Sequence, residues 1–433
     1  MKIVAFLPAK GSSSRVENKN VKLLDGKPLF LHTLEKLLAC DFIDEVYLDT
    51  ESDYIIDLAS YTNAKIMKRD ISLADNKTDG NKLFLNEVKH VDADIYIQVL
   101  CTSPFINPQK ILDGINAIKD TNEFDSAVLI KKEKQYTWSD NKTPDYDIKS
   151  IPNSVDIKDT IIETMGLYIV KKETALQTKR RIGNKPYLIE ASVEDSFDVN
   201  YEDDFNVANL IAAGKRERDR KLLNNMKSFM SSPLLSDILD DFGYRNQIIK
   251  GLSPNIQSAK LLGRAKTLRL RELKEDEPYD GIYKALSSYE TIIPNDIIMV
   301  ENEMDDFAYF GELNANLAIR SGAAGVIVGG HTRDGKAVYD LALPVFSKGY
   351  TCQDVRQRAT LDFINNPINM YGVTVHVGDL VFADSEGVVV IPNEIESAII
   401  DTIYQRGKNE KNILLDISQG VDTDILVKRY GFF

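Results

Sequence analysis

Apolar runs and amphipathic segments alternate along the first half of the chain. The runs predict strands, and the clearest amphipathic segments between them, residues 29–40 and 53–60, predict helices. This alternation indicates βαβ units, that is, a Rossmann-like α/β fold with a mostly parallel sheet and helices on both faces. Ligands of such sheets bind beyond the carboxyl ends of the strands. The predicted strands cover residues 2–7, 45–49, 95–100 and 126–130.

A polar stretch at residues 131–161 interrupts the alternation. Its prolines and its many Asp, Asn and Lys residues do not fit a strand of the sheet, and the charged residues at its start, 131–134, are expected to form a solvated face. We predict that this stretch leaves the sheet as a lid or as an arm for dimer formation.

The pattern changes near Ser231. From Leu261 onward, short strand-like runs alternate with glycine-rich turns, and a helix is predicted at residues 312–321. A chain of 433 residues is too long for one ordinary core, so two domains are expected. We assign them to residues 1–225 and 226–433.

Composition limits the class of protein. With 43% hydrophobic and 27% charged residues, the chain has the make-up of a globular protein. No apolar stretch approaches the roughly 20 residues that span a bilayer, and the N-terminus does not resemble a signal peptide. A net charge of -13 argues against direct binding of nucleic acid. The cysteines Cys40, Cys101 and Cys352 have no metal-ligand spacing and indicate free thiols, so a cytoplasmic location is expected.

Candidate chemistry begins directly after the first predicted strand. Residues 8–15 (Pro-Ala-Lys-Gly-Ser-Ser-Ser-Arg) are small, basic and rich in hydroxyl groups, and Lys19 and Asn20 follow them. A strand that leads into such a loop presents backbone N–H groups and cations to phosphates. The loop lacks the Gly-Lys-Ser/Thr ending of a Walker A sequence and the spaced glycines of a dinucleotide-binding loop. It therefore predicts a phosphate site of another kind.

The loop and its continuation resemble a known family. Residues 9–21 are similar to the signature of the acylneuraminate (CMP-sialic acid) cytidylyltransferases, and the resemblance covers residues 1–215. It implies that a hydroxyl group of a nonulosonic acid, or of another 3-deoxy-2-keto sugar acid, attacks the α-phosphate of CTP and that pyrophosphate leaves. The further matching pieces are residues 24–29, 33–35, 102–104 and 197–200.

Roles for individual residues follow from that resemblance. Lys10 and Lys19 are expected to be the catalytic cations, because the protein's part in this kind of transfer is mainly to place charge around the phosphates. Asp198 is expected to hold Mg²⁺ through its carboxylate, and its alternative role is that of a helix N-cap or turn residue. The expected nucleotide-binding residues are Ala9, Lys10, Gly11, Ser12, Ser13, Arg15, Lys19, Asn20, Thr102 and Ser103.

The chain departs from the family pattern at a few places. Asn200 stands where the family has a second aspartate, so the Mg²⁺ site would have one negative charge less. Leu100 stands where the family usually has glutamine, and Ser14-Arg15 replaces Lys-Gly in a way similar to the related Kdo cytidylyltransferases. These changes could shift the preference for base or sugar, or abolish the activity.

The second half resembles the RraA-like family, which includes the 4-hydroxy-4-methyl-2-oxoglutarate aldolases. The resemblance covers residues 231–391 and implies a second α/β domain, of the swivelling β/β/α type. The matching pieces are residues 234–239, 263–267, 311–313, 322–334, 343–349 and 377–392.

The resemblance also implies a chemistry for this half. In aldolases of the family, a divalent metal holds a 2-keto acid, and an arginine neutralises the enolate that forms when a C–C bond breaks. Asp334 is therefore expected to bind Mg²⁺ or Mn²⁺, and Arg333 to be the catalytic cation. Glu312 would either support a metal-bound water or be an acidic residue that favours a first helical turn. The expected substrate-binding residues are Gly311, Glu312 and Leu313, through their amides, and Arg333.

Two interpretations of the second half stay open. In the first, the chain is a bifunctional enzyme in which a cytidylyltransferase is joined to a metal-dependent lyase that makes or cleaves a 2-keto acid through pyruvate; the pair Arg333-Asp334 favours it. In the second, the RraA-like half is a non-catalytic module for oligomerisation or protein binding, which is favoured by Gly329, where the family usually has aspartate. Either way the resemblance implies a homo-oligomer, as a dimer, trimer or hexamer.

Overall fold

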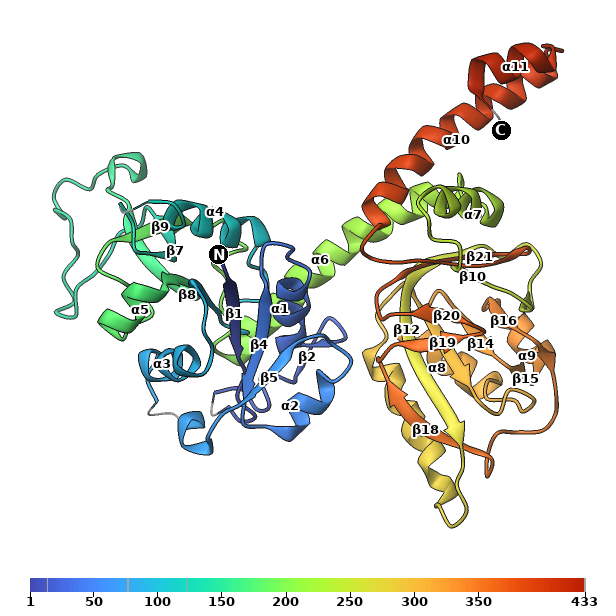
Figure 1. Cartoon of the computed structure of the whole chain (residues 1–433), viewed down its shortest axis with the longest axis horizontal. Coiled ribbons are helices and arrows are strands. Elements are labelled where there is room, and N and C mark those ends of the chain that lie inside the picture. Colours follow the sequence, from blue (N-terminus) through green and yellow to red (C-terminus); the bar gives the residue numbers. More distant parts are fainter. Residues whose placement is uncertain (14, 76–77, 122, 432–433) are drawn as a thin grey trace. The chain divides into compact units, whose positions relative to one another are not determined.

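The chain divides into two compact units, Met1–Ala212 and Ala213–Phe433 (Figure 1). The helix α6 (Glu202–Lys227) begins in the first unit and ends in the second, and residue 225 lies within it. None of the described helices combines the length and the apolar composition that crossing a bilayer requires. Ser14 of the predicted phosphate loop lies outside the described residues. The computed structural model describes residues 1–13, 15–75, 78–121 and 123–431, with the backbone alone at 407–411.

The described strands of the first unit form one sheet. Its neighbours run parallel except for the fifth strand in its order, β8, which is antiparallel to the strands on both sides. This confirms the predicted α/β fold with a mostly parallel sheet. The order is β5 (Lys65–Lys68), β4 (Glu45–Thr50), β1 (Ile3–Pro8), β6 (Ile95–Val99), β8 (Thr160–Lys171), β7 (Ser126–Glu133) and β9 (Pro186–Glu190), and β2 (Leu23–Leu24) pairs with β3 (Lys27–Pro28) apart from it.

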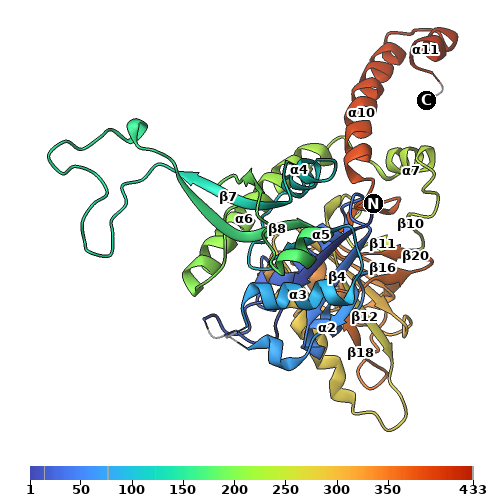
Figure 2. The ribbon, with the colours of Figure 1, turned by 60° about the vertical axis from the view of Figure 1, so that its left-hand side comes forward.

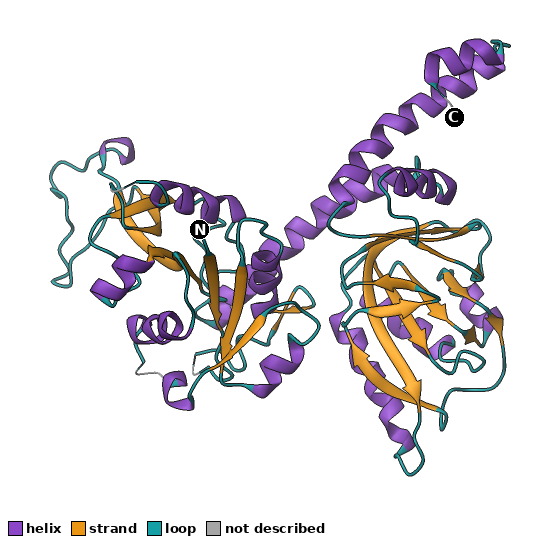
Figure 3. Ribbon diagram, viewed as in Figure 1, coloured by secondary structure: helices purple, strands orange, loops and turns teal. Residues whose placement is uncertain are grey.

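Helices cover both faces of this sheet (Figure 3). They are α1 (Leu29–Leu38), α2 (Asp53–Leu58), α3 (Gly80–His90), α4 (Pro108–Ile118) and α5 (Lys172–Thr178), together with the short 3-10 helix η1 (Ile71–Ala74). Because successive side chains of a strand point to opposite faces, Ala5 and Leu7 of β1 pack with α1, α2 and α4, whereas Val4 and Phe6 pack with α3 and α5. The sheet is therefore buried on both sides, as a parallel sheet must be.

Most of the predicted elements of this unit are present. Strands β1, β4, β6 and β7 and helices α1 and α2 lie where the apolar pattern predicts them. Strand β8 was not among the predicted strands, although residues 167–170 of it form a buried apolar run. Beyond Ile130, β7 pairs with β8 alone, and residues 134–159, which include η2 (Ser154–Asp156), run outside the sheet (Figure 2). The polar stretch thus leaves the sheet, and its role as a lid or arm stays a prediction.

The second unit is built on a larger mixed sheet. Its four central strands, β12, β13, β14 and β16, run parallel, and the strands flanking them are antiparallel. The order is β10 (Ile248–Ile249), β22 (Gly387–Ile391), β21 (Leu380–Asp384), β12 (Leu261–Glu272), β13 (Asp296–Asn302), β14 (Gly325–Gly329), β16 (Val345–Ser347) and β11 (Ser253–Pro254), with β18 (Ala359–Ile364) also paired to β12. The small sheets are β15 (His331–Thr332) with β17 (Gly349–Tyr350) and β19 (Ile368–Met370) with β20 (Val373–Val375).

Different layers cover the two faces of this sheet. The helices of the unit are α7 (Ser232–Asp241), η3 (Tyr279–Thr291), α8 (Glu312–Ser321), α9 (Gly335–Asp340), α10 (Glu396–Ser418) and α11 (Thr423–Tyr430). One face of the parallel strands packs against η3, α8 and α9, and the other against the hairpin β19–β20. Helices α7 and α10 pack on β21 and β22. The helix predicted at residues 312–321 is α8, and this unit too is an α/β domain, as predicted.

Candidate functional sites

The predicted phosphate loop lies at the carboxyl edge of the first sheet. It follows β1, and the neighbouring strands β4 and β6 place residues 50–52 and 100–103 at the same edge. The backbone N–H of Ala9 donates to the carbonyl of Asp49 over 2.9 Å, which continues the pairing of β1 with β4. The sheet therefore brings three segments that are distant in sequence to one place, the place where ligands of parallel sheets bind.

Lys19 is a buried cation of this site. It is only 7% exposed, and its ammonium group donates to the carbonyl of Val199 over 2.7 Å. The N–H of Val199 in turn donates to the carbonyl of Thr102 over 2.8 Å. Lys19 is thus held between the loop after β1, the loop after β6 and the segment before α6.

The other charged residues of the loop surround Lys19. Burial lowers the pKa of the Lys19 amine, against the opposing effects of Cys101 and Asp198, and the positive charges of Arg15 and Lys10 lower it further. Two cations and one carboxylate therefore lie close enough to Lys19 to act on its charge. Most of the predicted catalytic and metal-binding groups of this half meet at one point, as a site for a polyanion requires.

Asn20 is directed at the protein rather than outward. Its amide Nδ2 donates to the carbonyl of Lys10 over 2.8 Å, and its Oδ1 accepts from the thiol of Cys101 over 3.1 Å. Burial raises the pKa of that thiol to about 11, so it keeps its proton at neutral pH. Asn20, expected to contact the nucleotide, therefore braces the loop in the structure.

The remaining loop residues are placed at or near the surface. Ser12 is exposed, Ser13 lies within 3.5 Å of the N–H of Val16, and the guanidinium of exposed Arg15 lies 5.7 Å from the centre of the Tyr201 ring. Ser103, by contrast, is buried beneath β8: a Cβ at Gly166 would come within 2.6 Å of its hydroxyl oxygen. Nothing in these contacts brings Ser103 to the surface of the site.

Asp198 does not cap α6. The helix begins at Glu202, and the carboxylate of Asp204 in its first turn reaches back to accept the N–H groups of Asn200 and Tyr201 over 2.9 and 2.8 Å. The carboxylate of Asp198 accepts instead from the side-chain amide of Asn200. The predicted alternative of an N-cap is therefore wrong.

Asp198 offers a single carboxylate to a Mg²⁺ ion. The described residues contain no group of three His, Cys, Asp or Glu side chains that could enclose a metal ion. Mg²⁺ is, however, commonly held by one or two carboxylates together with substrate phosphates. Asp198 matches that pattern, with Asn200 orienting its carboxylate in place of supplying a second one.

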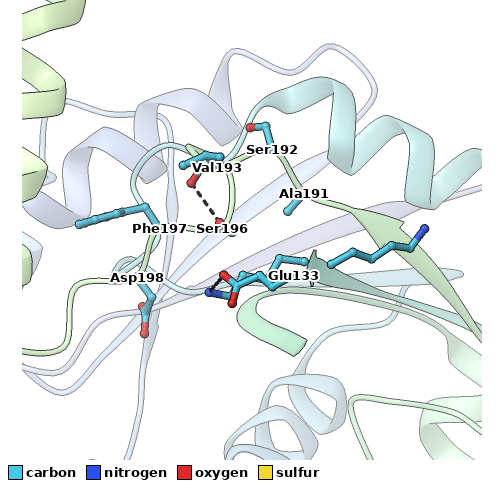
Figure 4. A pocket seen from close by; sticks show the side chains of 9 residues that line it. Glu133, Ala191, Ser192, Val193, Ser196, Phe197 and Asp198 are labelled. Atoms are coloured by element: carbon cyan, nitrogen blue, oxygen red, sulfur yellow. Dashed lines mark hydrogen bonds and ion pairs between the residues drawn. The ribbon is translucent and has the colours of Figure 1, made fainter. Parts of the chain in front are cut away.

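A pocket of about 450 Å³ opens beside Asp198 (Figure 4). Lys131 in its wall pairs with Glu133 over 2.6 Å, and Lys132 pairs with Glu190 over 2.7 Å. The start of the polar stretch was expected to be a solvated face; its charged side chains are half-buried or exposed, and three of them also line this pocket. The lining residues are Lys131, Lys132, Glu133, Ala191, Ser192, Val193, Ser196, Phe197 and Asp198.

In the second unit, Arg333 and Asp334 lie side by side after β15. Arg333 is held by Asp354, whose Oδ2 lies 2.7 Å from its Nη1, and by its own N–H, which donates to the carbonyl of Phe310 over 2.9 Å. Asp334 adopts a left-handed backbone conformation (φ 56°) and lies 3.7 Å from the Arg333 Nε. Both side chains are partly exposed, so the pair faces an open site.

The start of α8 approaches this pair closely. The N–H of Glu312 donates to Oδ2 of Asp334 over 3.2 Å, and a Cβ on Gly311 would come within 2.6 Å of the same oxygen. The amide expected to take a substrate carboxylate therefore binds Asp334 in the structure. The side chains of Glu312 and Leu313 are exposed.

A second pocket, of about 400 Å³, contains Arg333, Asp334 and Asp354 together with apolar side chains of η3 and α8, among them Ile282 and Leu317. Asp334 provides one carboxylate for a cation, and Asp354 is neutralised by Arg333. As in the first unit, the described residues form no group of three metal-ligating side chains, so a divalent metal here would take its remaining oxygen ligands from substrate and water.

Gly329 has a packing reason for lacking a side chain. It ends β14, and a Cβ there would lie 3.1 Å from the carbonyl oxygen of Val300 and 3.4 Å from the methyl group of Met370. An aspartate at this position would require its neighbours to move. The difference from the family pattern is thus accommodated by the packing around β13 and the hairpin β19–β20.

Comparison with known proteins gives one family match in each half of the chain. Residues 4–186 match the family model described as cytidylyltransferase, and residues 232–390 match the model described as aldolase/RraA. The family models thus show a cytidylyltransferase domain at residues 4–186 and an RraA-like domain at residues 232–390. The predicted resemblances are confirmed.

Individual relatives support the same division. The chain is 23% identical over 232 residues to the N-acylneuraminate cytidylyltransferase of Escherichia coli O18:K1:H7, covering 52% of this chain and 55% of that protein. It is 32% identical over 129 residues to the CMP-N,N'-diacetyllegionaminic acid synthase of Legionella pneumophila, covering 28% and 56%. A putative 4-hydroxy-4-methyl-2-oxoglutarate aldolase of Halalkalibacterium halodurans is 30% identical over 178 residues, covering 41% and 78%. The chain thus spans about half the length of these two cytidylyltransferase-type relatives.

Several residues of the two sites were not predicted. Glu51 could have been found, because it follows β4 as the phosphate loop follows β1, and the ends of parallel neighbours share an edge. Arg69 and Cys101 carry the same signal, because they follow the parallel strands β5 and β6. Asp354 carries none, because nothing in its spacing relates it to Arg333.

Proposed function

We propose that the first half of the chain is a CTP-dependent cytidylyltransferase that activates a nonulosonic or other 3-deoxy-2-keto sugar acid as its CMP conjugate. The observation that carries this proposal is the arrangement of Lys10, Arg15 and Asp198 around buried Lys19 at the carboxyl edge of a cytidylyltransferase-family sheet. The relatives named for N-acylneuraminate and diacetyllegionaminic acid support the class of acceptor.

In this reaction a hydroxyl oxygen of the sugar acid bonds to the α-phosphorus of CTP and gives up its proton to water, while the bond to the bridging oxygen breaks and pyrophosphate leaves. Lys10 and Lys19 stabilise the negative charge that builds up on the phosphate oxygens. Lys19 suits this role because the carbonyl of Val199 already orients it. Mg²⁺, held by Asp198 and the phosphates, would supply further positive charge.

The pocket beside Asp198 is the proposed place of the sugar acid. Its volume of about 450 Å³ suits a sugar of nine carbons, and it adjoins the carboxylate that we assign to the metal. Lys131 supplies a cation for the acid's carboxylate, with Glu133 fixing its position. The polar groups of Ser192 and Ser196 line the same wall for the sugar hydroxyls.

Pyrophosphate release tests the proposal. The chain is supplied with Mg²⁺, a panel of ulosonic acids and each of the four ribonucleoside triphosphates in turn. We expect release with CTP and one class of acid, and a loss of at least 100-fold in Lys19→Ala. Equal use of UTP or ATP would refute the cytidine assignment, and no release with any combination would refute the transferase.

We propose that the RraA-like half is a divalent-metal-dependent lyase acting on a 4-hydroxy-2-keto acid. The bond between C3 and the hydroxyl-bearing C4 breaks. The hydroxyl group loses its proton as a carbonyl forms at C4, and the electron pair of the broken bond becomes the enolate of pyruvate, which takes up a proton. Arg333, oriented by Asp354 at the mouth of a pocket of about 400 Å³, would stabilise that enolate. Mg²⁺ or Mn²⁺ on Asp334 would bind the keto acid.

Metal-dependent pyruvate release from such acids, compared with Asp334→Ala, tests the lyase. If no acid yields pyruvate, the alternative applies, in which this half is a module for assembly or protein binding.

We further propose that residues 1–225 and 226–433 are the functional domains and that the chain forms a homo-oligomer. Light scattering on the full chain checks its assembly, and a monomer would refute it.

A further inference from the structure

One peptide unit of the phosphate loop, that between Lys10 and Gly11, is held on both of its polar atoms. Its carbonyl oxygen accepts from Nδ2 of Asn20 over 2.8 Å, and its N–H donates to Oε1 of Glu51 over 2.6 Å. A Cβ on Gly11 would lie 2.8 Å from Cβ of Ser52, so the loop passes too close to the end of β4 to leave room for a side chain at this position. Rotation of this peptide would break both hydrogen bonds.

Glu51 is itself fixed from behind. Its second carboxylate oxygen lies 3.3 Å from Nε of Arg69, a side chain that is 3% exposed. The guanidinium of Arg69 also donates to the carbonyl of Asp49 over 2.9 Å and lies 3.5 Å from the Asp49 carboxylate. A hydrogen bond from a backbone N–H to such a carboxylate is stronger than one between neutral groups.

A buried acid pair stands behind Arg69. Glu87 of α3 and Asp49 of β4 are fully buried, and Gln98 of β6 donates to Glu87 over 2.7 Å. Burial raises the pKa of Glu87 well above its usual range, and the nearby charge of Asp49 raises it further. With Glu87 ionised, neither oxygen of the Asp49 carboxyl group would have a hydrogen-bond donor in the described part of the chain, whereas a protonated Glu87 provides one.

The other side of the peptide is fixed through Cys101. Its thiol lies 3.1 Å from Oδ1 of Asn20 and 3.6 Å from the carbonyl oxygen of Pro8, and donation to the nearer oxygen leaves the amide nitrogen of Asn20 to face the Lys10 carbonyl. The thiol is buried and holds its proton, so it acts here as a hydrogen-bond donor.

We propose that Glu51 and Cys101 are positioning residues of the nucleotide site, which fix the orientation of the Lys10–Gly11 peptide from opposite sides. In the observed orientation the Lys10 carbonyl points at Asn20 and the N–H of Gly11 points at Glu51. A reversed peptide would point its carbonyl oxygen at the Glu51 carboxylate and its N–H at the side-chain amide of Asn20, so both hydrogen bonds would be lost. This inference rests on the proposed CTP chemistry, because it concerns how the loop meets a phosphate.

The orientation also divides the loop into two parts. The N–H of Gly11, which was expected to bind phosphate, donates to Glu51. The phosphate-binding part of the loop therefore begins after Gly11, at Ser12 and Ser13, and the Lys10–Gly11 peptide serves as its support.

Two pairs of variants test the positioning role in the full chain. Glu51→Ala removes the acceptor for Gly11, and Glu51→Gln keeps an oxygen there while losing the charge that faces Arg69. Cys101→Ala removes the donor to Asn20, and Cys101→Ser restores one. The matched controls are Glu45→Ala, at the opposite end of β4, and Cys40→Ala, a buried cysteine after α1 whose thiol donates to the carbonyl of Lys36.

The measurements are CTP affinity by calorimetry, and kcat and KM for CTP by pyrophosphate release. We expect Glu51→Ala to weaken CTP binding about tenfold or more and to raise KM accordingly, because the whole charge-assisted hydrogen bond is lost. Glu51→Gln should have an intermediate effect, because it keeps an acceptor oxygen and loses only the charge. Cys101→Ala should weaken binding several-fold, and Cys101→Ser should return it to within about twofold of the wild type. The control variants should bind CTP like the wild type.

The outcomes separate the two proposals. A wild-type chain that neither binds CTP nor releases pyrophosphate refutes the proposed function and this inference with it. An active wild type with unchanged CTP affinity in Glu51→Ala, or with equal effects of Cys101→Ala and Cys101→Ser, refutes the positioning role alone. If Glu51→Ala does not fold, as judged by circular dichroism, the Cys101 pair decides.

Discussion

The protonation state of Glu87 gives the sharpest physical prediction for this chain. Folding raises the pKa of this carboxyl group, so the folded state binds a proton that the unfolded state releases. The free energy of unfolding therefore falls as pH rises. Between the ordinary value of 4.5 and the folded pKa, this group lowers the free energy of unfolding by about 1.4 kcal/mol for each pH unit. The variant Glu87→Gln has the shape of the protonated acid without its titration.

We therefore expect Glu87→Gln to become more stable than the wild type as pH rises from 5 to 7, by about 1.4 kcal/mol per unit until the folded pKa is reached. The Gln98 amide retains an acceptor in this variant, and Asp49 retains a donor. Urea unfolding followed by circular dichroism measures the difference, and hydrogen exchange of α3 and β6 assigns it to the first unit.

A matched control has the opposite sign. Hydrogen bonding to Lys65, together with Tyr47 and Lys2, lowers the pKa of Glu45 to about 2, so its charge stabilises the fold above the ordinary glutamate pKa. Glu45→Gln should therefore be less stable than the wild type by an amount that is constant between pH 5 and 7. A difference for Glu87→Gln that is equally constant over this range would mean that Glu87 is ionised in the fold, and the reasoning would fail.

The remaining predictions concern single contacts. Gly11→Ala places a Cβ 2.8 Å from that of Ser52, so it should weaken CTP binding at least tenfold in calorimetry while leaving the melting temperature nearly unchanged. Asp354→Asn should lower kcat for pyruvate release about tenfold without changing metal affinity, because only the charge that orients Arg333 is lost. Gly329→Asp buries a carboxylate against a carbonyl, so it should destabilise the second unit by about 1–3 kcal/mol in urea and should not raise lyase activity.

The candidate sites of the two halves differ in how far their charged groups are already oriented without a ligand. In the first, Lys19 is buried and oriented before any ligand arrives, which is the condition for electrostatic catalysis without reorganisation. In the second, Asp334 already binds the N–H of Glu312 and faces Arg333. A metal there would compete with these contacts, so we expect weak metal binding in the absence of substrate.

Local pattern was sufficient for the architecture. The alternation of apolar runs and amphipathic segments predicted β1, β4, β6, β7, α1 and α2, because the face that a side chain occupies depends only on the period of its own element. The same reasoning placed Lys10 and Lys19 at the carboxyl edge of a parallel sheet, where a basic loop after a strand must lie. The prediction left out β8, although residues 167–170 of that strand form a buried apolar run.

Contacts between elements were decided by tertiary packing alone. Glu87 meets Asp49 and Gln98 only because α3 covers one face of the sheet, and Asp354 meets Arg333 only because the fold brings the loop after β17 to the loop after β15. No spacing in the sequence encodes such meetings, since each depends on the summed packing of many residues between the partners. The sequence by itself thus determined the two α/β domains and their basic loop, and the packing of helices on sheets decided which buried groups hold that loop in place.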